Sequence, residues 1–344
     1  MADKILVSGA SGFIASHIIE KLLAAGSEIV GTVRDPANYE KTAHLMTMKG
    51  AETHLTLVAA DLNDSDPFSD YVDVDIIMHT ASPYVLTVKN AQRDLVAPAV
   101  NGTLSMLTAA AKSKRVRRVI LTSSMAAVTD EPDGRLLTEA DWNNESSLTR
   151  NPYFYSKVLA ERAAWDFMKR ENPHFDLIVI NPFLVIGPAH TASINTSHQI
   201  LVDLVNGNFP AIIDLTWGFV DVRDVADAHI AAANIQAASG RYVCATATID
   251  MSKVVDIARA NGWGHAKLPK MSLTGPLGTA LTKLASYTQP SGAGSYLRTH
   301  VGRALRFDNS KIRNELAINF RSPETSIRDA LVDLAKWNHI PQPR

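Results

Sequence analysis

Short apolar runs and amphipathic stretches alternate along the first half of the chain. The apolar runs have the length of strands, and three of them are rich in valine and isoleucine; they cover residues 4–8, 28–33, 55–60, 75–80 and 116–122. Between the first two runs, apolar side chains recur at helical spacing over 14–25. Strands separated by helices of this length form βαβ units, so the pattern predicts an α/β fold with a parallel sheet.

The alternation continues as far as residue 182. A long helix is predicted over 152–169, because Pro152 suits a first helical turn, and a sixth strand is predicted over 176–180. Beyond this strand, proline and glycine residues gather in several places. The cluster at 290–294 predicts an exposed loop.

Two structural units follow from these patterns. Residues 1–182 form the first unit, and 218–240 return to its sheet as a strand-like segment at 218–222 and an alanine-rich helix. Residues 183–217 and 241–344 are expected to form a smaller C-terminal α+β lobe over the strand ends. A length of 344 residues agrees with this division, because a folding unit has roughly 150 residues.

Charge and cysteine content narrow the class of protein. The 34 basic and 35 acidic residues leave a net charge of -1, which disfavours a nucleic-acid or anionic membrane partner. A single cysteine, Cys244, has no partner for an intramolecular disulfide, as is usual in a reducing compartment. The first apolar run is too short for a signal peptide, and no run is long enough to span a bilayer. A cytoplasmic protein is therefore expected.

The turn after the first apolar run has the composition of a dinucleotide site. Gly9 suits the turn, Gly12 lets the backbone approach a diphosphate, and Ala15 allows close packing of helix and sheet. The diphosphate would lie at the helix N-terminus, where unpaired N–H groups favour negative charge. The alternative is a tight strand–helix turn without a ligand, but the position between a first strand and an amphipathic helix favours a nucleotide.

Two cations follow the second predicted strand, where dinucleotide folds meet the adenosine ribose. Arg34 comes directly after the strand and Lys41 follows one or two helical turns later, so the pair favours the 2′-phosphate of NADP(H). Asp61, at the end of the third strand, is placed to reach the adenine or the ribose. The alternatives are two solvated surface cations and a plain helix cap.

Candidate chemistry lies at the end of the fifth strand and at the start of the long helix. Ser124 follows the strand, while Tyr153 and Lys157 are four residues apart and share one helix face. An ammonium beside a phenol lowers its pKa toward neutrality, so Tyr153 is placed to donate a proton to a carbonyl that Ser124 holds. An exposed helix pair is the alternative, and Tyr155 competes for the acid role but meets Leu159 instead of a cation.

Taken together, these motifs resemble extended short-chain dehydrogenases/reductases. The likeness is to the branch of dihydroflavonol reductases, cinnamoyl-CoA reductases and yeast-type methylglyoxal reductases. It runs from residue 4 to about 230 and includes His79-Thr-Ala-Ser-Pro83, Asn181-Pro182 and Val220-Asp-Val-Arg-Asp-Val-Ala226. The resemblance implies a Rossmann-type, doubly wound sheet and NADPH-dependent reduction of a carbonyl to an alcohol.

The same resemblance assigns residues to roles. The catalytic set falls on Ser124, Tyr153 and Lys157, of which Tyr153 and Lys157 also contact the cofactor. The other implied cofactor contacts are Gly9, Ser11, Gly12, Phe13, Ile14, Arg34, Lys41, Asp61, Leu62, Thr80, Ala81, Ser82, Pro182, Val185 and Ser197.

The expected substrate pocket departs from the flavonoid reductases. Thr129 stands where those enzymes carry an asparagine, and Leu184 stands where some ketone reductases of the branch have an aromatic residue. Together with Tyr84 and Met125, these residues predict an apolar pocket for a small carbonyl compound, although core packing is an equal alternative for Met125 and Leu184. The alternative function is that of a dihydroflavonol reductase or a cinnamoyl-CoA reductase.

Other function classes fit the sequence less well. A nucleotide-sugar epimerase would favour an acid alone at the second-strand corner, and a non-catalytic NADP sensor would usually lose the Tyr/Lys pair. Histidines such as His79 and His229 show no metal-ligand spacing, so no catalytic metal is expected. A monomer or a homodimer is expected.

Overall fold

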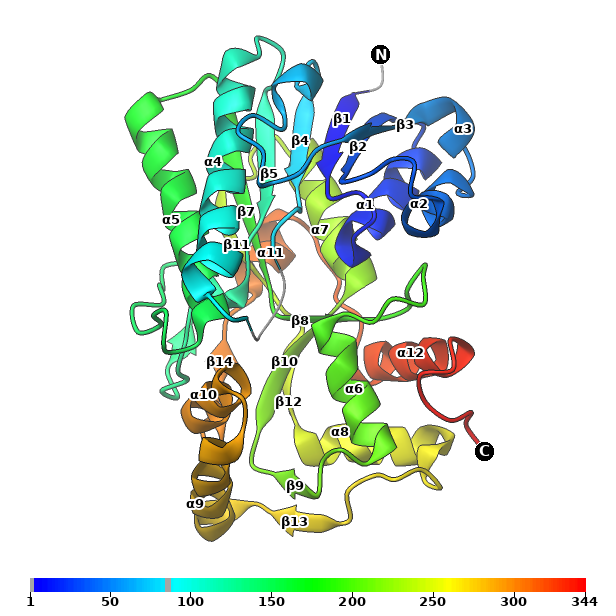
Figure 1. The fold of residues 1–344 in the computed structure, drawn as a ribbon, viewed down its shortest axis with the longest axis vertical. Helices are drawn as coiled ribbons and strands as arrows, with labels where there is room; N and C mark the ends of the chain where they lie inside the picture. Colours follow the sequence, from blue (N-terminus) through cyan, green and yellow to red (C-terminus); the bar gives the residue numbers. More distant parts are fainter. Residues whose placement is uncertain (1–2, 84–87) are drawn as a thin grey trace.

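A seven-stranded parallel sheet forms the centre of the computed structural model, which describes residues 3–83 and 88–344 (Figure 1). Its strands are β1 (Lys4–Ser8), β2 (Glu28–Val33), β3 (Leu55–Ala59), β4 (Ile76–His79), β5 (Arg118–Thr122), β7 (Asp176–Pro182) and β11 (Gly240–Cys244). They lie in the order β11-β7-β5-β4-β1-β2-β3. The chain therefore has the Rossmann-type, doubly wound sheet that was predicted.

Helices cover both faces of this sheet. One face carries α4 (Ala97–Lys112) and α5 (Pro152–Glu171). The apolar cluster on the other face includes residues of five helices. These are α1 (Phe13–Ala24), α2 (Tyr39–Met46), α3 (Ala51–His54), α7 (Val222–Asn234) and α11 (Ser310–Glu315). Because both faces are covered, β4 and β5 are buried along their whole length, which explains the continuous apolar run at the centre of each strand.

A smaller lobe lies below the sheet in Figure 1. Strands β8 (Leu184–Ile186), β10 (Thr216–Asp221) and β12 (Ala247–Asp250) form one sheet, and β9 (Ala211–Ile213) pairs with β13 (Met271–Leu273). The two-residue strands β6 (Leu136–Leu137) and β14 (Arg306–Phe307) also pair. The helices of this part are α6 (Thr196–Asn206), α8 (Met251–Ala258), α9 (Gly275–Ala285), α10 (Ser291–His300) and α12 (Pro323–Lys336).

Two details differ from the sequence-based expectation. The segment at 218–222 does not return to the main sheet, because β10 pairs with β8 and β12 and buries Trp217 and Phe219 in the core of the lobe. Helix α7 packs on the main sheet as predicted, and β11 joins that sheet beside β7, although residues 241–344 were assigned to the lobe. The predicted loop at 290–294 is the start of α10: Pro290 precedes its first turn, and a Cβ at Gly294 would lie 2.5 Å from the carbonyl oxygen of Ser286.

The helices are those of a packed α/β protein. Even α5, with 20 residues, carries several charged side chains. Within residues 3–83 and 88–344, none combines the length and the apolar character needed to cross a membrane.

Candidate active site

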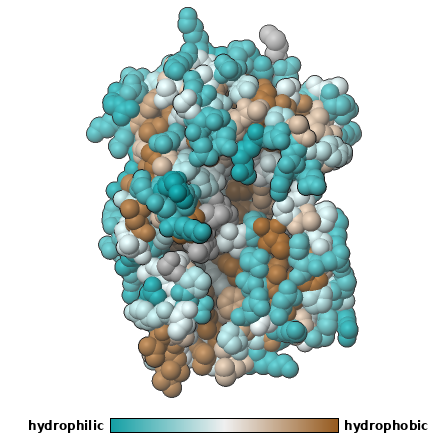
Figure 2. Space-filling model, in the orientation of Figure 1, coloured by the Kyte–Doolittle hydropathy of each residue, from teal (hydrophilic) through white to brown (hydrophobic). Residues whose placement is uncertain are grey.

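A cleft of about 1250 Å³ separates the carboxyl edge of the main sheet from the lobe. Figure 2 shows it as a hollow across the middle of the molecule. The sequence-predicted residues that line it are Gly9, Ser11, Gly12, Phe13, Ile14, Arg34, Asp61, Leu62, Thr80, Ala81, Ser82, Ser124, Tyr153, Lys157, Pro182, Leu184, Val185 and Ser197. Residues from distant parts of the sequence therefore meet at one edge of the sheet, where open α/β folds bind ligands.

The turn between β1 and α1 fits a dinucleotide diphosphate. Gly9 has a positive φ of 66°, and a Cβ there would lie 3.1 Å from the Cα of Ala81. Gly12 caps α1 without a side-chain hydrogen bond, which leaves the first N–H groups of the helix facing the cleft. A larger side chain at either position would narrow a cradle that suits a phosphate group.

Ser8 holds this turn against the end of β4. Its hydroxyl oxygen accepts the N–H groups of Thr80 and Ala81 at 3.0 and 3.1 Å. The hydroxyl proton is then available for Nδ1 of His79, 2.8 Å away. These bonds fix the backbone of a segment that lines the cleft.

The end of β2 presents one cation to the cleft. Arg34 lines the cleft, whereas the carboxylate of Asp35 accepts the N–H of Ala37 at 2.9 Å and so closes a local turn. Lys41 lies exposed on α2 and is not among the lining residues. The structure thus brings only Arg34 of the predicted cation pair to the cleft wall.

Helix α5 places Tyr153 and Lys157 on the same wall. Both side chains are buried, and the Lys157 ammonium is 5.6 Å from the centroid of the Tyr153 ring. Lys157 Nζ donates to the hydroxyl of Ser82 at 2.8 Å. Burial lowers the pKa of Lys157 to about 8, which still leaves most of this side chain protonated at pH 7.

Ser124 follows β5 and faces the same part of the cleft. Its hydroxyl oxygen accepts the N–H of Ala126 at 3.1 Å, so its own proton is available to a ligand. Its backbone carbonyl accepts from the side-chain amide of Asn181 at 3.1 Å. The backbone of Ser124 is thus fixed from the neighbouring strand β7.

A buried carboxylate that the sequence analysis missed supports these residues. Glu161 lies one turn beyond Lys157 on α5 and accepts hydrogen bonds from Ser123 (2.5 Å), Asn181 (2.7 Å) and Nε of Arg241 (2.5 Å). Its side chain is fully buried and that of Arg241 nearly so. The i+4 spacing from Lys157 was the available signal for Glu161; nothing in the sequence pointed to Arg241.

The lobe supplies an apolar wall. Leu184 lines the cleft as expected. The aromatic and aliphatic residues from this side that the sequence did not single out are Phe183, Ile200, Phe209, Leu215, Trp217, Tyr296 and Leu297.

Two other predicted pocket residues are placed elsewhere. Met125 is fully buried in a cluster with Val128 and Leu137, and Thr129, also buried, is not among the lining residues. Tyr84 lies outside the described residues.

Comparison with known proteins gives this geometry a context. The model of the NAD dependent epimerase/dehydratase family matches residues 5–245. "Cinnamoyl-CoA reductase CAD2" of Medicago truncatula is 40% identical over 271 residues, which is 75% of this chain and 81% of the relative. "Tetraketide alpha-pyrone reductase 1" of Arabidopsis thaliana is 32% identical over 347 residues, covering 98% and 97%.

A solved structure is similar over almost its whole length. It is the yeast methylglyoxal/isovaleraldehyde reductase Gre2 complexed with NADPH, with a TM-score of 0.80 and 29% identity. The match covers 97% of this chain and 99% of that one.

Proposed function

We propose a reaction for this chain on the following premise: the chain belongs to the NAD dependent epimerase/dehydratase family and is an NADP(H)-dependent oxidoreductase. This membership confirms the resemblance to extended short-chain reductases, and the relatives named above are reductases, not epimerases. We infer that the chain reduces an aldehyde or ketone to the alcohol. The observation that carries this inference is the convergence of Ser124, Tyr153 and Lys157 on one cleft.

Each of these side chains has a distinct role in the proposed reaction. Bound NADPH supplies the hydride that reaches the carbonyl carbon. Tyr153 gives its hydroxyl proton to the carbonyl oxygen, and Ser124 donates a hydrogen bond to the same oxygen. Lys157, charged at pH 7 and close to the Tyr153 ring, stabilises the phenolate that the proton transfer leaves.

The described residues also fit NADP(H). The β1–α1 turn offers a glycine cradle and a helix N-terminus for the diphosphate. Arg34 is placed to bind the 2′-phosphate, since it lines the cleft and Asp35 does not. We propose a strong preference for NADPH over NADH on this basis.

We further propose that the lobe selects the substrate. Its wall of Phe209, Trp217, Tyr296 and similar residues suits an apolar carbonyl compound. The cinnamoyl-CoA reductases among the relatives favour a second candidate, a CoA thioester. That substrate carries several phosphate charges. Of the three lining cations among the described residues, however, Arg93 is paired with Asp94 at 2.6 Å, Arg34 is assigned to the cofactor and Lys157 to the catalytic set. An uncharged aldehyde or ketone is therefore favoured.

Tyr153→Phe tests the catalytic assignment. We expect kcat for an aromatic aldehyde to fall roughly a hundredfold to ten-thousandfold, because general acid catalysis contributes that much. NADPH affinity, measured by fluorescence titration, should change far less. Tyr155→Phe is the matched control on the same helix and should keep its activity. A Tyr153→Phe variant with most of the wild-type rate would contradict the assignment.

A substrate panel tests the proposed class. Free aldehydes, diketones and CoA thioesters are compared by kcat/KM with NADPH, and the products are identified by chromatography. We expect the free carbonyl compounds to give the higher values. Faster turnover of the thioesters would favour the second candidate.

A further inference from the structure

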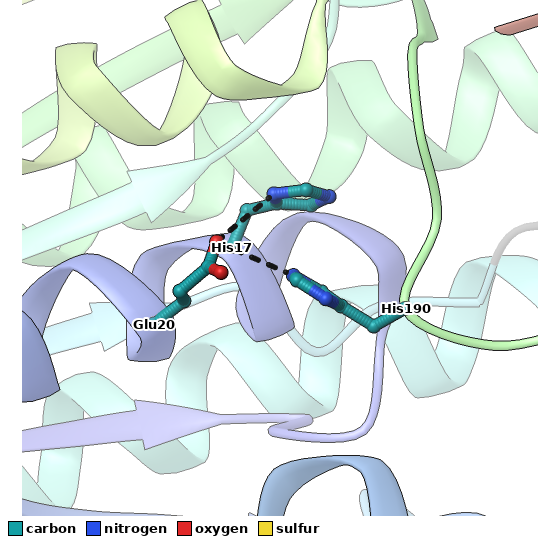
Figure 3. A group of neighbouring side chains, drawn as sticks. All are labelled: His17, Glu20 and His190. Atoms are coloured by element: carbon teal, nitrogen blue, oxygen red, sulfur yellow. Dashed lines mark ion pairs between the residues drawn. The ribbon is translucent and has the colours of Figure 1, made fainter. Parts of the chain in front are cut away.

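Three potential metal ligands meet where α1 lies beside the segment after β8 (Figure 3). His17 and Glu20 are three residues apart on α1, and His190 belongs to that segment. A carboxylate oxygen of Glu20 lies 3.8 Å from Nδ1 of His17 and 3.5 Å from Nε2 of His190. We propose that His17, Glu20 and His190 form a binding site for a divalent transition-metal ion, Zn²⁺ in the first place.

The tautomer of His17 is fixed in the form that binds a metal. Its Nε2 lies 2.9 Å from the carbonyl oxygen of Pro188, and a carbonyl only accepts hydrogen bonds, so Nε2 carries the proton and donates it. Nδ1 of the neutral ring therefore keeps its lone pair, on the side of Glu20. An N–H bond to a backbone carbonyl is the usual way in which a protein orients a metal-binding histidine.

His190 offers a second nitrogen, and this one has no hydrogen-bond partner among the described residues. Its Nε2 is buried, and a buried polar atom normally has such a partner. Its ring lies 4.2 Å from the ring of His17, centroid to centroid. Nε2 of His190 and Nδ1 of His17 therefore both lie near the carboxylate of Glu20.

Glu20 supplies the negative charge of the site and lies where an ion can reach it from solvent. Its side chain is about half exposed (54%), so an ion can enter from solvent and keep water in its remaining positions. Two imidazoles and one carboxylate form a donor set that zinc binds in proteins. Bonds of about 2.0–2.1 Å in a tetrahedron put ligand atoms about 3.3 Å apart. The three ligand atoms here lie within 4.8 Å of one another, with 3.5 and 3.8 Å to Glu20, so side-chain rotations would bring them to that spacing.

A bound ion would join two segments that border the cleft. Helix α1 contributes Phe13 and Ile14 to the cleft wall, and the segment that holds His190 leads to Asn195 and Ser197. None of the three proposed ligands is a lining residue. Ion binding is therefore expected to stabilise the fold in proportion to ion concentration and to need neither cofactor nor substrate.

The test uses the untagged full chain after treatment with a chelator. Zn²⁺ binding is measured by titration calorimetry, and Co²⁺ binding by the visible absorption of a cobalt ion with nitrogen ligands. We expect one Zn²⁺ per chain, with a rise of the melting temperature on addition of Zn²⁺. His190→Ala should abolish this binding and Glu20→Gln should weaken it at least tenfold. His174→Ala changes an exposed histidine outside the three proposed ligands, just before β7, and should leave the binding intact.

The outcomes separate clearly. Loss of the one-ion stoichiometry in His190→Ala, with retention in His174→Ala, supports the site. Absence of saturable binding in the wild type, or unchanged binding in both His190→Ala and Glu20→Gln, overturns it. Far-ultraviolet circular dichroism verifies that each variant is folded. If His190→Ala does not fold, the binding measured for Glu20→Gln decides the question.

Discussion

Replacement of Glu161 by glutamine is expected to destabilise the fold and to slow the reaction together. The wild-type carboxylate faces Arg241 on one oxygen and accepts from Ser123 and Asn181 on the other. Glutamine has nearly the same shape but removes the charge opposite the Arg241 guanidinium, which is only 7% exposed. It also turns an amide donor toward the donor group of Asn181. If Asn181 flipped to accept this donor, its oxygen would face the carbonyl of Ser124.

The size of the effect follows from the burial of this pair. Removal of one partner of a buried ion pair costs about 3–5 kcal/mol, because the other charge stays buried without compensation. At roughly 2 °C per kcal/mol for a chain of this size, the melting temperature should fall by roughly 6–10 °C. We also expect a lower kcat, because the amide that fixes the Ser124 carbonyl has lost its own anchor.

Thermal and urea unfolding, followed by circular dichroism, measure the stability, and the rate of NADPH oxidation measures kcat. Glu171→Gln is the control, because it removes an exposed carboxylate from the end of the same helix and should cost little. The double variant Glu161→Met/Arg241→Met removes both charges and should be more stable than the sum of its single variants predicts. A loss below about 1 kcal/mol in Glu161→Gln, or strict additivity in the double variant, would refute the reasoning.

Three further predictions rest on charge. Burial depresses the pKa of Lys157 from 10.5 to about 8, so the buried ammonium lowers the stability of the fold by about 3 kcal/mol below pH 8. Lys157→Met should therefore raise the melting temperature at pH 7 while it abolishes turnover. A lower melting temperature would contradict this. Arg34→Ala should raise KM for NADPH at least about tenfold with little change for NADH, and Lys41→Ala should do less; equal losses with both cofactors would argue against phosphate binding. Stability should fall as pH drops from about 6.5 toward 4, because five buried histidines bind protons in this range when the chain is unfolded but not when it is folded. An unchanged urea midpoint between pH 7 and 5 would contradict this prediction. Those histidines, with pKa values lowered to about 3 or 4, are His17, His79, His198, His229 and His300.

Local sequence signals were sufficient where one periodicity dominates. The first two predicted strands have the bounds of β1 and β2, and α5 begins at Pro152 as its proline suggested. Such elements are recognisable because their apolar pattern and their end residues agree. The turn at Gly9 belongs to this group as well, since glycine alone adopts its positive φ without strain.

Long-range packing decided the features that the sequence could not predict. Nothing local distinguishes β10, which enters the lobe sheet, from β11, which joins the main sheet, because both are short segments that mix apolar residues with a glycine and a charged residue. Lys41 was expected beside Arg34 from helical spacing, but the direction of α2 leaves it exposed and off the cleft. Glu161 and Arg241 are 80 residues apart and meet only after β11 pairs with β7.

The order of groups along α5 explains why the Lys157 ammonium remains available to Tyr153. Tyr153, Lys157 and Glu161 follow one another at four-residue intervals, so a carboxylate lies one turn from the ammonium. Among the described residues, however, Glu161 pairs with Arg241, and Lys157 has a hydroxyl partner in Ser82 and no ion pair. A direct Lys157–Glu161 pair would raise the pKa of the lysine and cancel much of its field at the phenol. The buried arginine therefore does more than compensate a buried charge: it leaves Lys157 without a competing carboxylate, as the proposed role of its ammonium beside Tyr153 requires.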